Sequence, residues 1–223
     1  MTRGRGRKPR TTRTRSRRPL FVVYCEGDKT EREYVEHLRS SLPSDAVSIR
    51  VETPGSARRT LADAASTAVK ELSKGPQDID WSVWILCDVD DDGAVLRQLG
   101  AAGGGTGRYK WAVSNPSIAA WLLMHVQRLG RPEHRDLFAS QAAQKNLLSG
   151  KNKKTLEPGR LKGLSGAAVA EAERLRKKHL GDGTEFPNDN PSSTVPLMLE
   201  DLVGMYNRTD AGKLEPVSVQ DLY

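Results

Sequence analysis

The chain has 223 residues, 37% of them hydrophobic, and a formal net charge of +7 at pH 7. This length suits one large domain with a sizeable core, or one domain with an elaborated tail. No run approaches the length of about eighteen apolar residues that marks a membrane span, and no apolar segment follows the basic N-terminus as in a signal peptide, so we expect a cytoplasmic protein without membrane association. The two cysteines, Cys25 and Cys87, lack the C-x-x-C spacing of a structural zinc site and are consistent with a reducing compartment.

The positive charge is concentrated at the start of the chain. Residues 1–18 contain nine Arg or Lys and no acid, which leaves a formal charge of −2 for the rest of the chain. So polar a segment is predicted to be a disordered basic arm, and it can neutralise phosphates whatever the base sequence. Its nucleic-acid-binding candidates are Arg13, Arg15, Arg17 and Arg18. The alternative is a solvated tail whose affinity for nucleic acid is incidental.

The first half of the chain alternates between predicted strands and helices. Residues 20–25 are continuously apolar or aromatic and end at Glu26, which is typical of a central parallel strand covered by helices on both faces. Residues 81–87 have the same character and end at Asp88. Between these strands we expect a helix capped by Thr30 and ended by Pro43, a short strand at 47–51, and a helix over 61–72. This order predicts an α/β fold with a parallel sheet core flanked by helices.

The second half is predicted to be mainly helical. The glycine-rich residues 100–107 lack the residue order of a phosphate-binding loop, so we expect a flexible connection. We then expect a strand at 109–114, a helix started by Asn115 and Pro116, a lysine-rich insertion or helical subdomain at 130–163, a helix over 165–179 capped by Ser165, and a helix over 194–206 before a fraying tail. The expected parts are the arm at 1–18, an α/β core at 19–129, and a helical elaboration at 130–223 packed on that core.

Three carboxylates are predicted to meet at one edge of the sheet. Glu26 and Asp88 follow two parallel strands, and open α/β sheets bind their ligands at the carboxyl ends of such strands. Asp90 lies two residues beyond Asp88 and would project to the same side of an extended chain. Carboxylate oxygens suit Mg²⁺ (or Mn²⁺), which can bind phosphate oxygens and activate a water. Glu26 can be a ligand or a general acid or base, and Lys29 a phosphate contact. The alternative is that such acids only form turns.

Four segments carry a resemblance to a known family. Residues 25–31 resemble the E-G-x-K-T-E opening of the RloB-like family, and residues 88–90 are similar to its D-x-D motif. Both motifs are also the signature of the wider Toprim fold, shared by topoisomerases, primases and OLD-type nucleases. Residues 114–125 resemble the family's S-N-P-x-F-E-x-W-x-L-x-H segment, and residues 190–195 resemble its N-P-S-T-x-V segment. The match covers residues 18–205 in the right order.

The resemblance implies a Toprim-like sheet and a metal-dependent nucleic-acid phosphodiesterase of prokaryotic anti-phage defence, where RloB-like proteins are associated with an ATPase of the AAA or ABC type. The chain departs from the family at Ala119, where the family has a glutamate. If that glutamate supports the metal site, either activity is weakened or another acid, such as Glu200 or Asp201, replaces it. Asn115 is retained, and it is a nucleic-acid-binding candidate with a helix cap as the alternative.

We therefore expect a Mg²⁺-dependent nuclease that cleaves DNA or RNA. Its expected catalytic residues are Glu26, Lys29, Asp88 and Asp90, and its expected metal ligands are Glu26, Asp88 and Asp90. The rival from another class is a nucleic-acid-binding or partner-binding module of a defence complex, in which the arm and the lysine-rich insertion hold the ligand and the acids merely bind metal. A third hypothesis is phosphoryl or nucleotidyl transfer to a small nucleotide. Assembly into a homo-oligomer is compatible with each of these.

Overall fold

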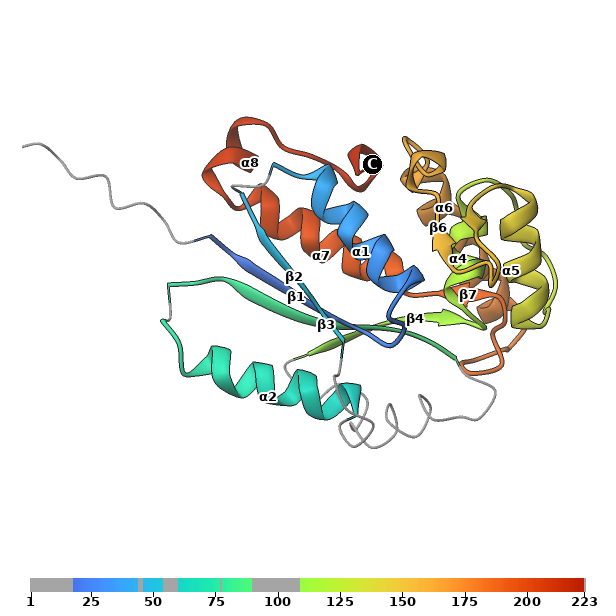
Figure 1. The fold of residues 1–223 in the computed structure, drawn as a ribbon, viewed down its shortest axis with the longest axis horizontal. Coiled ribbons are helices and arrows are strands. Elements are labelled where there is room, and N and C mark those ends of the chain that lie inside the picture. Colours follow the sequence, from blue (N-terminus) through green and yellow to red (C-terminus); the bar gives the residue numbers. More distant parts are fainter. Residues whose placement is uncertain (1–17, 44–45, 54–59, 77, 90–108, 223) are drawn as a thin grey trace, which may run out of the picture.

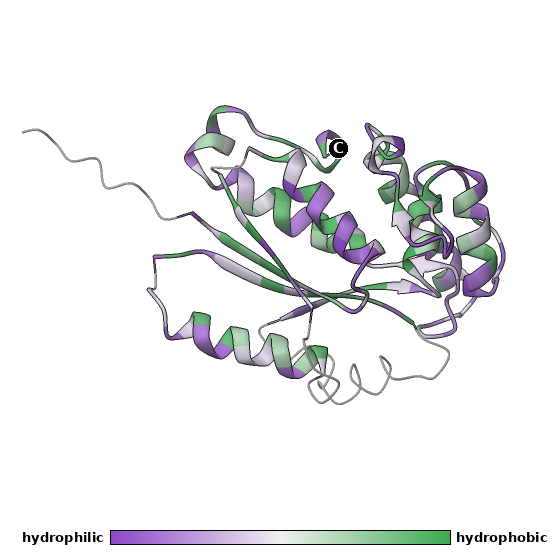
Figure 2. Cartoon of the chain, in the orientation of Figure 1, coloured by the Kyte–Doolittle hydropathy of each residue, from purple (hydrophilic) through white to green (hydrophobic). Residues whose placement is uncertain are grey.

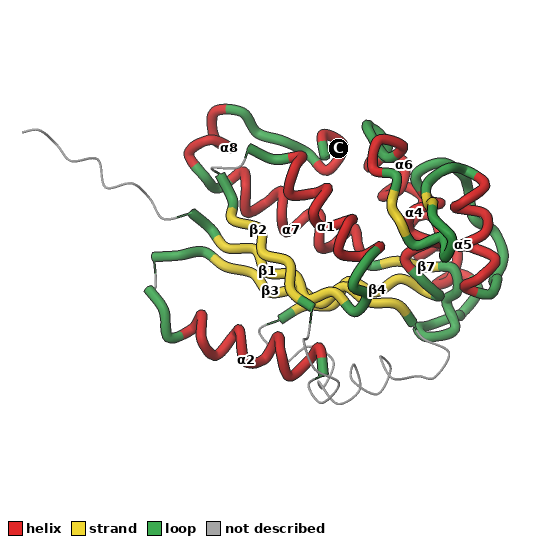
Figure 3. Tube along the Cα trace, in the orientation of Figure 1, coloured by secondary structure: helices red, strands yellow, loops and turns green. Residues whose placement is uncertain are grey.

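A five-stranded sheet forms the centre of the molecule. The computed structural model describes residues 18–43, 46–53, 60–76, 78–89 and 109–222. The strands of the sheet are β1 (Leu20–Cys25), β2 (Ser48–Glu52), β3 (Trp81–Asp88), β4 (Lys110–Asn115) and β7 (Ser192–Ser193). Their order is β2-β1-β3-β4-β7, with the first four parallel and β7 antiparallel at the β4 edge (Figure 3). The predicted parallel α/β core is confirmed.

Helices cover both faces of this sheet and one of its ends. The helices are α1 (Thr30–Ser41), α2 (Leu61–Ser73), α4 (Ile118–Met124), α5 (Arg135–Gln144), α6 (Ser165–Gly181), α7 (Val195–Asn207) and α8 (Asp210–Leu214), with short 3-10 turns at Pro158–Arg160 and Val219–Asp221. Helices α1 and α7 lie on one face and α2 on the other, whereas α4, α5 and α6 gather beyond the carboxyl ends of the strands (Figure 1). None of the helices in the described part of the chain is both long and apolar enough to cross a membrane.

The strands are hydrophobic because both of their faces are covered. Phe21, Val23 and Cys25 of β1 belong to the large core beneath α1 and α7, while Val22 belongs to the smaller core beneath α2. The hydropathy colouring shows the same arrangement, with apolar strands between helices whose outer faces are polar (Figure 2). The large core continues from α1 through α4 to α6 and α7, so one body of buried side chains spans the expected boundary after residue 129.

Two helix starts differ from the sequence prediction. Thr30 and Ser165 were expected to cap α1 and α6, but each is instead the first residue of its helix. The Thr30 hydroxyl donates to the carbonyl of Lys154 at 2.7 Å, and the Ser165 hydroxyl donates to the carbonyl of Leu222 at 2.6 Å. The capping prediction was wrong because a hydroxyl at a helix start can bond to a distant backbone group as well as to its own helix.

The lysine-rich segment is only partly helical. Within residues 130–163 the chain forms α5, then a two-stranded hairpin of β5 (Leu148–Ser149) and β6 (Thr155–Leu156), and then the first 3-10 turn. The expectation of a helical subdomain is therefore wrong for its second half. The glycine-rich residues 100–107 and the acid Asp90 lie outside the described residues.

The C-terminal segment does not fray as expected. After α7 the chain forms α8 and a 3-10 turn, and Leu222 is completely buried. Residues Val217 and Val219 pack against the large core beside it. The expectation was wrong because this short segment returns its apolar residues to the core, which the local sequence does not reveal.

Leu222→Ala should therefore lower the free energy of unfolding by about 2–5 kcal/mol, because it removes a fully buried side chain. Urea denaturation followed by circular dichroism measures the change. Leu214→Ala is the control, since the Leu214 side chain is 84% exposed and its loss should change stability by no more than about 0.5 kcal/mol. Equal effects of the two substitutions would contradict the docked C-terminus.

Candidate metal and phosphate site

The pairing of β1 with β3 brings two of the predicted acids together. These strands are adjacent and parallel, with Cys25 opposite Leu86, so their next residues emerge at the same sheet edge. The amide of Glu26 donates to the Leu86 carbonyl at 3.0 Å, and the Glu26 carboxylate accepts from the amide of Asp88 at 3.0 Å. The contact between Glu26 and Asp88 across 62 residues is therefore fixed by sheet register. Asp90, the third predicted ligand, lies outside the described residues.

Asp88 is a buried carboxylate that holds the start of α4. Its side chain is 7% exposed, and its Oδ1 accepts from the amide of Ile118 at 2.7 Å. Its Oδ2 lies 3.6 Å from the guanidinium of Arg135, which projects from the start of α5. A carboxylate is favourable at a helix N-terminus because the first amides lack partners within the helix. The last residue of β3 thus joins the sheet to two helices of the C-terminal half.

Helix α4 is capped by a different residue from the one that the sequence predicted. Asn115 and Pro116 were expected to begin this helix, but Asn115 ends β4 and the N-cap position is Ser117, whose side chain makes no capping hydrogen bond. The carboxylate of Asp88 makes that bond from a different strand. The prediction was wrong because a cap supplied by tertiary structure has no local signature.

Glu31 is a further acid at this site that the sequence pattern did not single out. It is only 8% exposed and lines the same cavity as Glu26 and Asp88. A side chain at Gly27 would collide with the Glu31 carboxylate, so the glycine leaves the space that Glu31 fills. The available signal was its place in the motif at residues 25–31, because the first turn of a helix that follows a strand directly lies beside the end of that strand.

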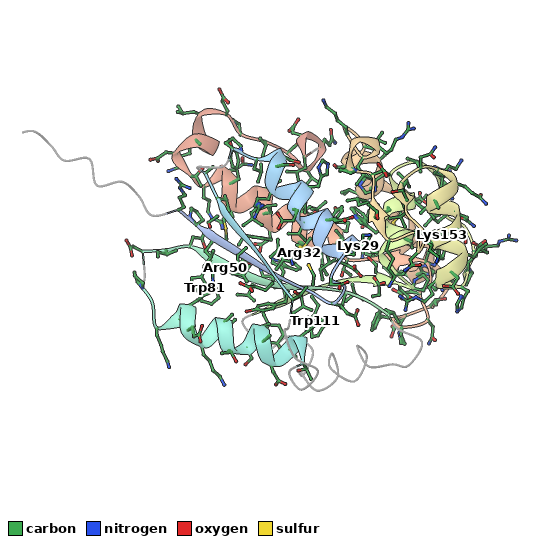
Figure 4. All side chains as sticks on the ribbon, viewed as in Figure 1. Lys29, Arg32, Arg50, Trp81, Trp111 and Lys153 are labelled. Carbon is green, nitrogen blue, oxygen red and sulfur yellow. The ribbon has the colours of Figure 1, made fainter. Side chains whose placement is uncertain are left out.

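The acids share a cavity of about 300 Å³ with several basic side chains. The acids that line it are Glu26, Asp28, Glu31, Asp88 and Asp136. The bases that line it are Lys29, Arg135, Lys153 and Lys154. Five acids and four bases give a formal charge of −1, so a single divalent cation would change the sign and make the cavity attractive to phosphate. Lys29 and Lys153 come from the elements on either side, α1 and the β5–β6 hairpin (Figure 4).

Electrostatics at the site disfavour negative charge on the buried acids. Burial raises the pKa of Asp88 well above its usual range, and the charges of Glu31 and Glu26 raise it further, against the opposing effects of the Ile118 amide and Arg135. Burial also raises the pKa of Glu31, although its own amide and the cations Lys154 and Arg135 oppose the rise. Carboxylates held together at such a cost in a cavity are typical of a functional site.

The donor chemistry of this edge suits a hard divalent cation. The oxygens of Glu26, Glu31 and Asp88 are of the kind that Mg²⁺ prefers, and a cation would relieve their repulsion. Among the described residues no three such side chains are gathered closely enough to hold an ion, and the cation nearest Asp88 is the guanidinium of Arg135. Glu26 and Asp88 are the described residues able to provide a metal site, and Asp90 would have to complete it.

Other predicted residues lie away from this cavity. Asn115 is buried, and its side-chain amide donates to the carbonyl of Pro187 and to Asp189, each at 2.8 Å, so it secures the loop before β7. Arg18 is exposed at the opposite end of β1, roughly 26 Å from Glu26 at the rise of a strand. Arg13, Arg15 and Arg17 lie outside the described residues.

The acids expected to replace the family glutamate at Ala119 are not at the site. Asp201 accepts from Ser82 at 2.6 Å, from Trp84 at 2.8 Å and from Lys110 at 3.0 Å, on the α7 face of the sheet. Glu200 is its exposed neighbour on α7. Both belong to a surface depression beside Trp111 that shares no residue with the cavity of Asp88.

The comparison with family models matches residues 21–202 to the model described as RloB-like protein. The chain belongs to the RloB-like family. The match includes Glu26, Asp88, the α4 segment and the first part of α7, and it excludes the arm. No curated protein and no solved structure matches the chain.

In this RloB-like chain Ala119 stands at the position of the expected family glutamate. Ala119 lines the cavity together with Glu31, while Glu200 and Asp201 do not. Glu31 is therefore one of the acids that share a cavity with position 119. His125, another retained residue of that segment, is buried against Trp121, with its Nδ1 at 3.1 Å from the Trp121 carbonyl. Burial lowers the pKa of His125 to about 4, so it is neutral at pH 7.

Asp88→Asn should stabilise the metal-free RloB-like protein at pH 8. A folded-state pKa above the unfolded value of about 3.9 means that stability falls as the pH rises through the folded pKa. Asparagine keeps the oxygen that accepts from Ile118 and lacks the charge, so we expect a gain of about 1 kcal/mol, or about 2–4 °C in melting temperature. Thermal unfolding in EDTA at pH 5 and pH 8 measures this gain. The substitution should also reduce the difference between the melting temperatures at the two pH values.

Asp201→Asn is the matched control, and it should change the melting temperature in the opposite direction. Burial alone would raise the pKa of Asp201, but the donors Ser82, Trp84 and Lys110 outweigh it and lower the pKa. Neutralising Asp201 should therefore lower the melting temperature at pH 8. A loss of stability in both variants would show that Asp88 is an ordinary structural acid.

Proposed function

We propose that this RloB-like protein is a Mg²⁺-dependent nuclease that cleaves the phosphodiester bonds of DNA or RNA. The observation that supports the proposal most strongly is the cavity in which Glu26 and the buried Asp88 meet, with the pKa of Asp88 raised and basic side chains lining the same cavity. A bound Mg²⁺ would supply Lewis-acid stabilisation of the phosphate and a water of lowered pKa. In this proposal Glu26, Asp88 and Asp90 hold the ion.

The remaining residues have separate roles in this proposal. Glu26 is the more exposed of the two described acids and is suited to move a proton to or from the reacting oxygen, in addition to binding the ion. Lys29 is exposed at the N-cap of α1, where its ammonium can contact a phosphate oxygen. Ile118 and the start of α4 keep Asp88 in place through the hydrogen bond at 2.7 Å.

The second candidate is a nucleic-acid-binding or partner-binding module without cleavage activity. One observation favours it: the cation nearest Asp88 is Arg135, so the acids are already partly neutralised by the protein itself. On the resemblance to the family, we place either activity in prokaryotic anti-phage defence beside an ATPase partner of the AAA or ABC type, in the cytoplasm.

Asp88→Asn and Asp90→Asn should each abolish Mg²⁺-dependent cleavage, by a factor of about 100 or more, because each removes a proposed ligand. Cleavage of labelled DNA and RNA with Mg²⁺ or Mn²⁺ measures the loss. In parallel, the rise in melting temperature on adding Mn²⁺ should largely disappear. Asp136→Asn, at an exposed acid that lines the same cavity, is the control and should retain both responses.

Cleavage by neither the wild type nor any variant, together with tight nucleic-acid binding, would replace the nuclease proposal with the binding module. Retention of the Mn²⁺ response by both Asn variants would show that the acids do not bind the ion.

Deleting residues 1–17 should weaken nucleic-acid binding and flatten its dependence on salt. For every phosphate that the arm no longer neutralises, the slope of log affinity against log salt should decrease in magnitude by about 0.7–0.9. Fluorescence anisotropy at several salt concentrations measures this slope, and circular dichroism checks the fold. Because Arg18 and the start of β1 lie at the sheet end opposite Asp88, the Mn²⁺ response should not change. An unchanged dependence of affinity on salt would show that the arm does not bind the phosphates of the nucleic acid.

A further inference from the structure

The β5–β6 hairpin forms part of the lining of the cavity that contains the acids. Its connecting segment carries three exposed lysines, Lys151, Lys153 and Lys154. The hairpin itself is firmly placed, because Leu148 and Leu156 are both buried in the large core. Its lysines are therefore presented from a fixed support.

Two hydrogen bonds join the hairpin to the first turns of α1. The Thr30 hydroxyl donates to the Lys154 carbonyl at 2.7 Å, and the amide of Leu156 donates to the Glu33 carboxylate at 2.6 Å. Helix α1 starts directly after β1, so these bonds link the hairpin to the strand end that carries Glu26. The lysines of the hairpin and the acids at the end of β1 are thereby held in a fixed position relative to each other, although they lie far apart in sequence.

The hairpin turn adopts an unusual backbone conformation at one of its lysines. Lys153 has φ of 51°, in the left-handed region that residues other than glycine seldom occupy. Its amide donates to the Gly150 carbonyl at 3.0 Å, and its ammonium donates to the Ser140 hydroxyl of α5 at 2.9 Å. Such conformations persist when the surrounding structure requires them, and they are frequent at ligand-binding sites. The turn places Lys153 between the cavity and α5.

Arg135 adds a third basic group to this cavity from the start of α5. Its guanidinium lies 3.6 Å from Asp88, and its charge together with that of Lys154 acts on Glu31. Arg135, Lys153 and Lys154 therefore line the cavity that holds the acids. A planar guanidinium with two ammonium groups is suited to successive phosphate oxygens of a polynucleotide, because each group can contact a different phosphate.

We propose that Arg135, Lys153 and Lys154 form a phosphate-binding subsite that holds the backbone of a nucleic acid across the cavity mouth. The role of this subsite in cleavage rests on the proposed function. Its affinity for nucleic acid does not, because binding at the subsite requires neither metal nor cleavage. A polynucleotide fits better than a small phosphate ester, because the cations are spread over the hairpin and α5 and two of them are exposed. The strand would run along the hairpin and the start of α5, with one phosphate above Asp88.

The double substitution Lys153→Asn with Lys154→Gln tests the subsite. Asparagine tolerates the left-handed conformation of residue 153, and the backbone carbonyl of residue 154 still accepts from Thr30. The control is Lys70→Gln with Lys74→Gln, which removes the same charge from exposed positions on and just after α2, on the opposite face of the sheet. Full-length proteins are titrated in EDTA against fluorescein-labelled single-stranded DNA, single-stranded RNA and duplex DNA, each about 20 nucleotides or base pairs long.

The hairpin variant should bind about tenfold more weakly than the wild type at low salt, and the slope of log affinity against log salt should decrease in magnitude by about 1.4–1.8, as expected when two phosphates are no longer neutralised. The arm contributes equally to every protein compared, so it cancels. Affinity and slope equal to those of the control variant would overturn the proposal, since the effect would then be one of net charge. If the double variant does not fold, Lys154→Gln alone should reduce the slope by about half as much.

Cleavage separates this proposal from the proposed function. In the hairpin variant KM for an oligonucleotide should rise by about tenfold while the melting-temperature response to Mn²⁺ stays the same. If the wild type does not cleave but still binds nucleic acid more tightly than the hairpin variant, the nuclease proposal is wrong and the subsite proposal stands. If the wild type cleaves, and KM and affinity are unchanged in the hairpin variant, the subsite proposal is wrong and the nuclease proposal stands.

Discussion

The buried carboxylate of Asp88 is the group on which the arrangement of the site depends. Removing an ionised carboxylate from water costs several kcal/mol unless hydrogen bonds and opposite charge compensate. Here the amide of Ile118 and the guanidinium of Arg135, both from the C-terminal half of the chain, compensate only in part, because burial and the charges of Glu31 and Glu26 leave the pKa of Asp88 raised. The sheet edge and the helices beyond it are thus joined through one carboxyl group.

That connection explains why the C-terminal half surrounds the site. Helix α4 begins where Asp88 can accept from its first amide, α5 follows with Arg135, and the hairpin returns to α1 through Thr30 and Glu33. Acids and bases therefore line a single cavity together. Because the formal charge of this cavity changes sign with one divalent ion, metal binding and phosphate binding would support each other.

Much of the fold was predictable because the signals were local. The continuous apolar runs of β1 and β3 correctly indicated parallel strands covered on both faces, and α2 was found within a residue at each end. The caps assigned to Thr30, Asn115 and Ser165 were wrong, since their polar groups bond to distant partners or lie outside the helix. Glu31 was missed because its burial beside Gly27 depends on how α1 leaves the strand.

The sequence by itself determined the strand pattern, the family motifs and the placement of Glu26 and Asp88 at one edge of the sheet, because parallel strands bring their carboxyl ends to the same edge. That β1 and β3 are neighbours was decided by the tertiary structure. Only the tertiary structure decided that Arg135 faces Asp88, that Glu31 shares the cavity and that Asp201 does not. The reason is that these contacts depend on how helices pack around the sheet. Such packing is set by the whole buried core, which no local pattern of residues records.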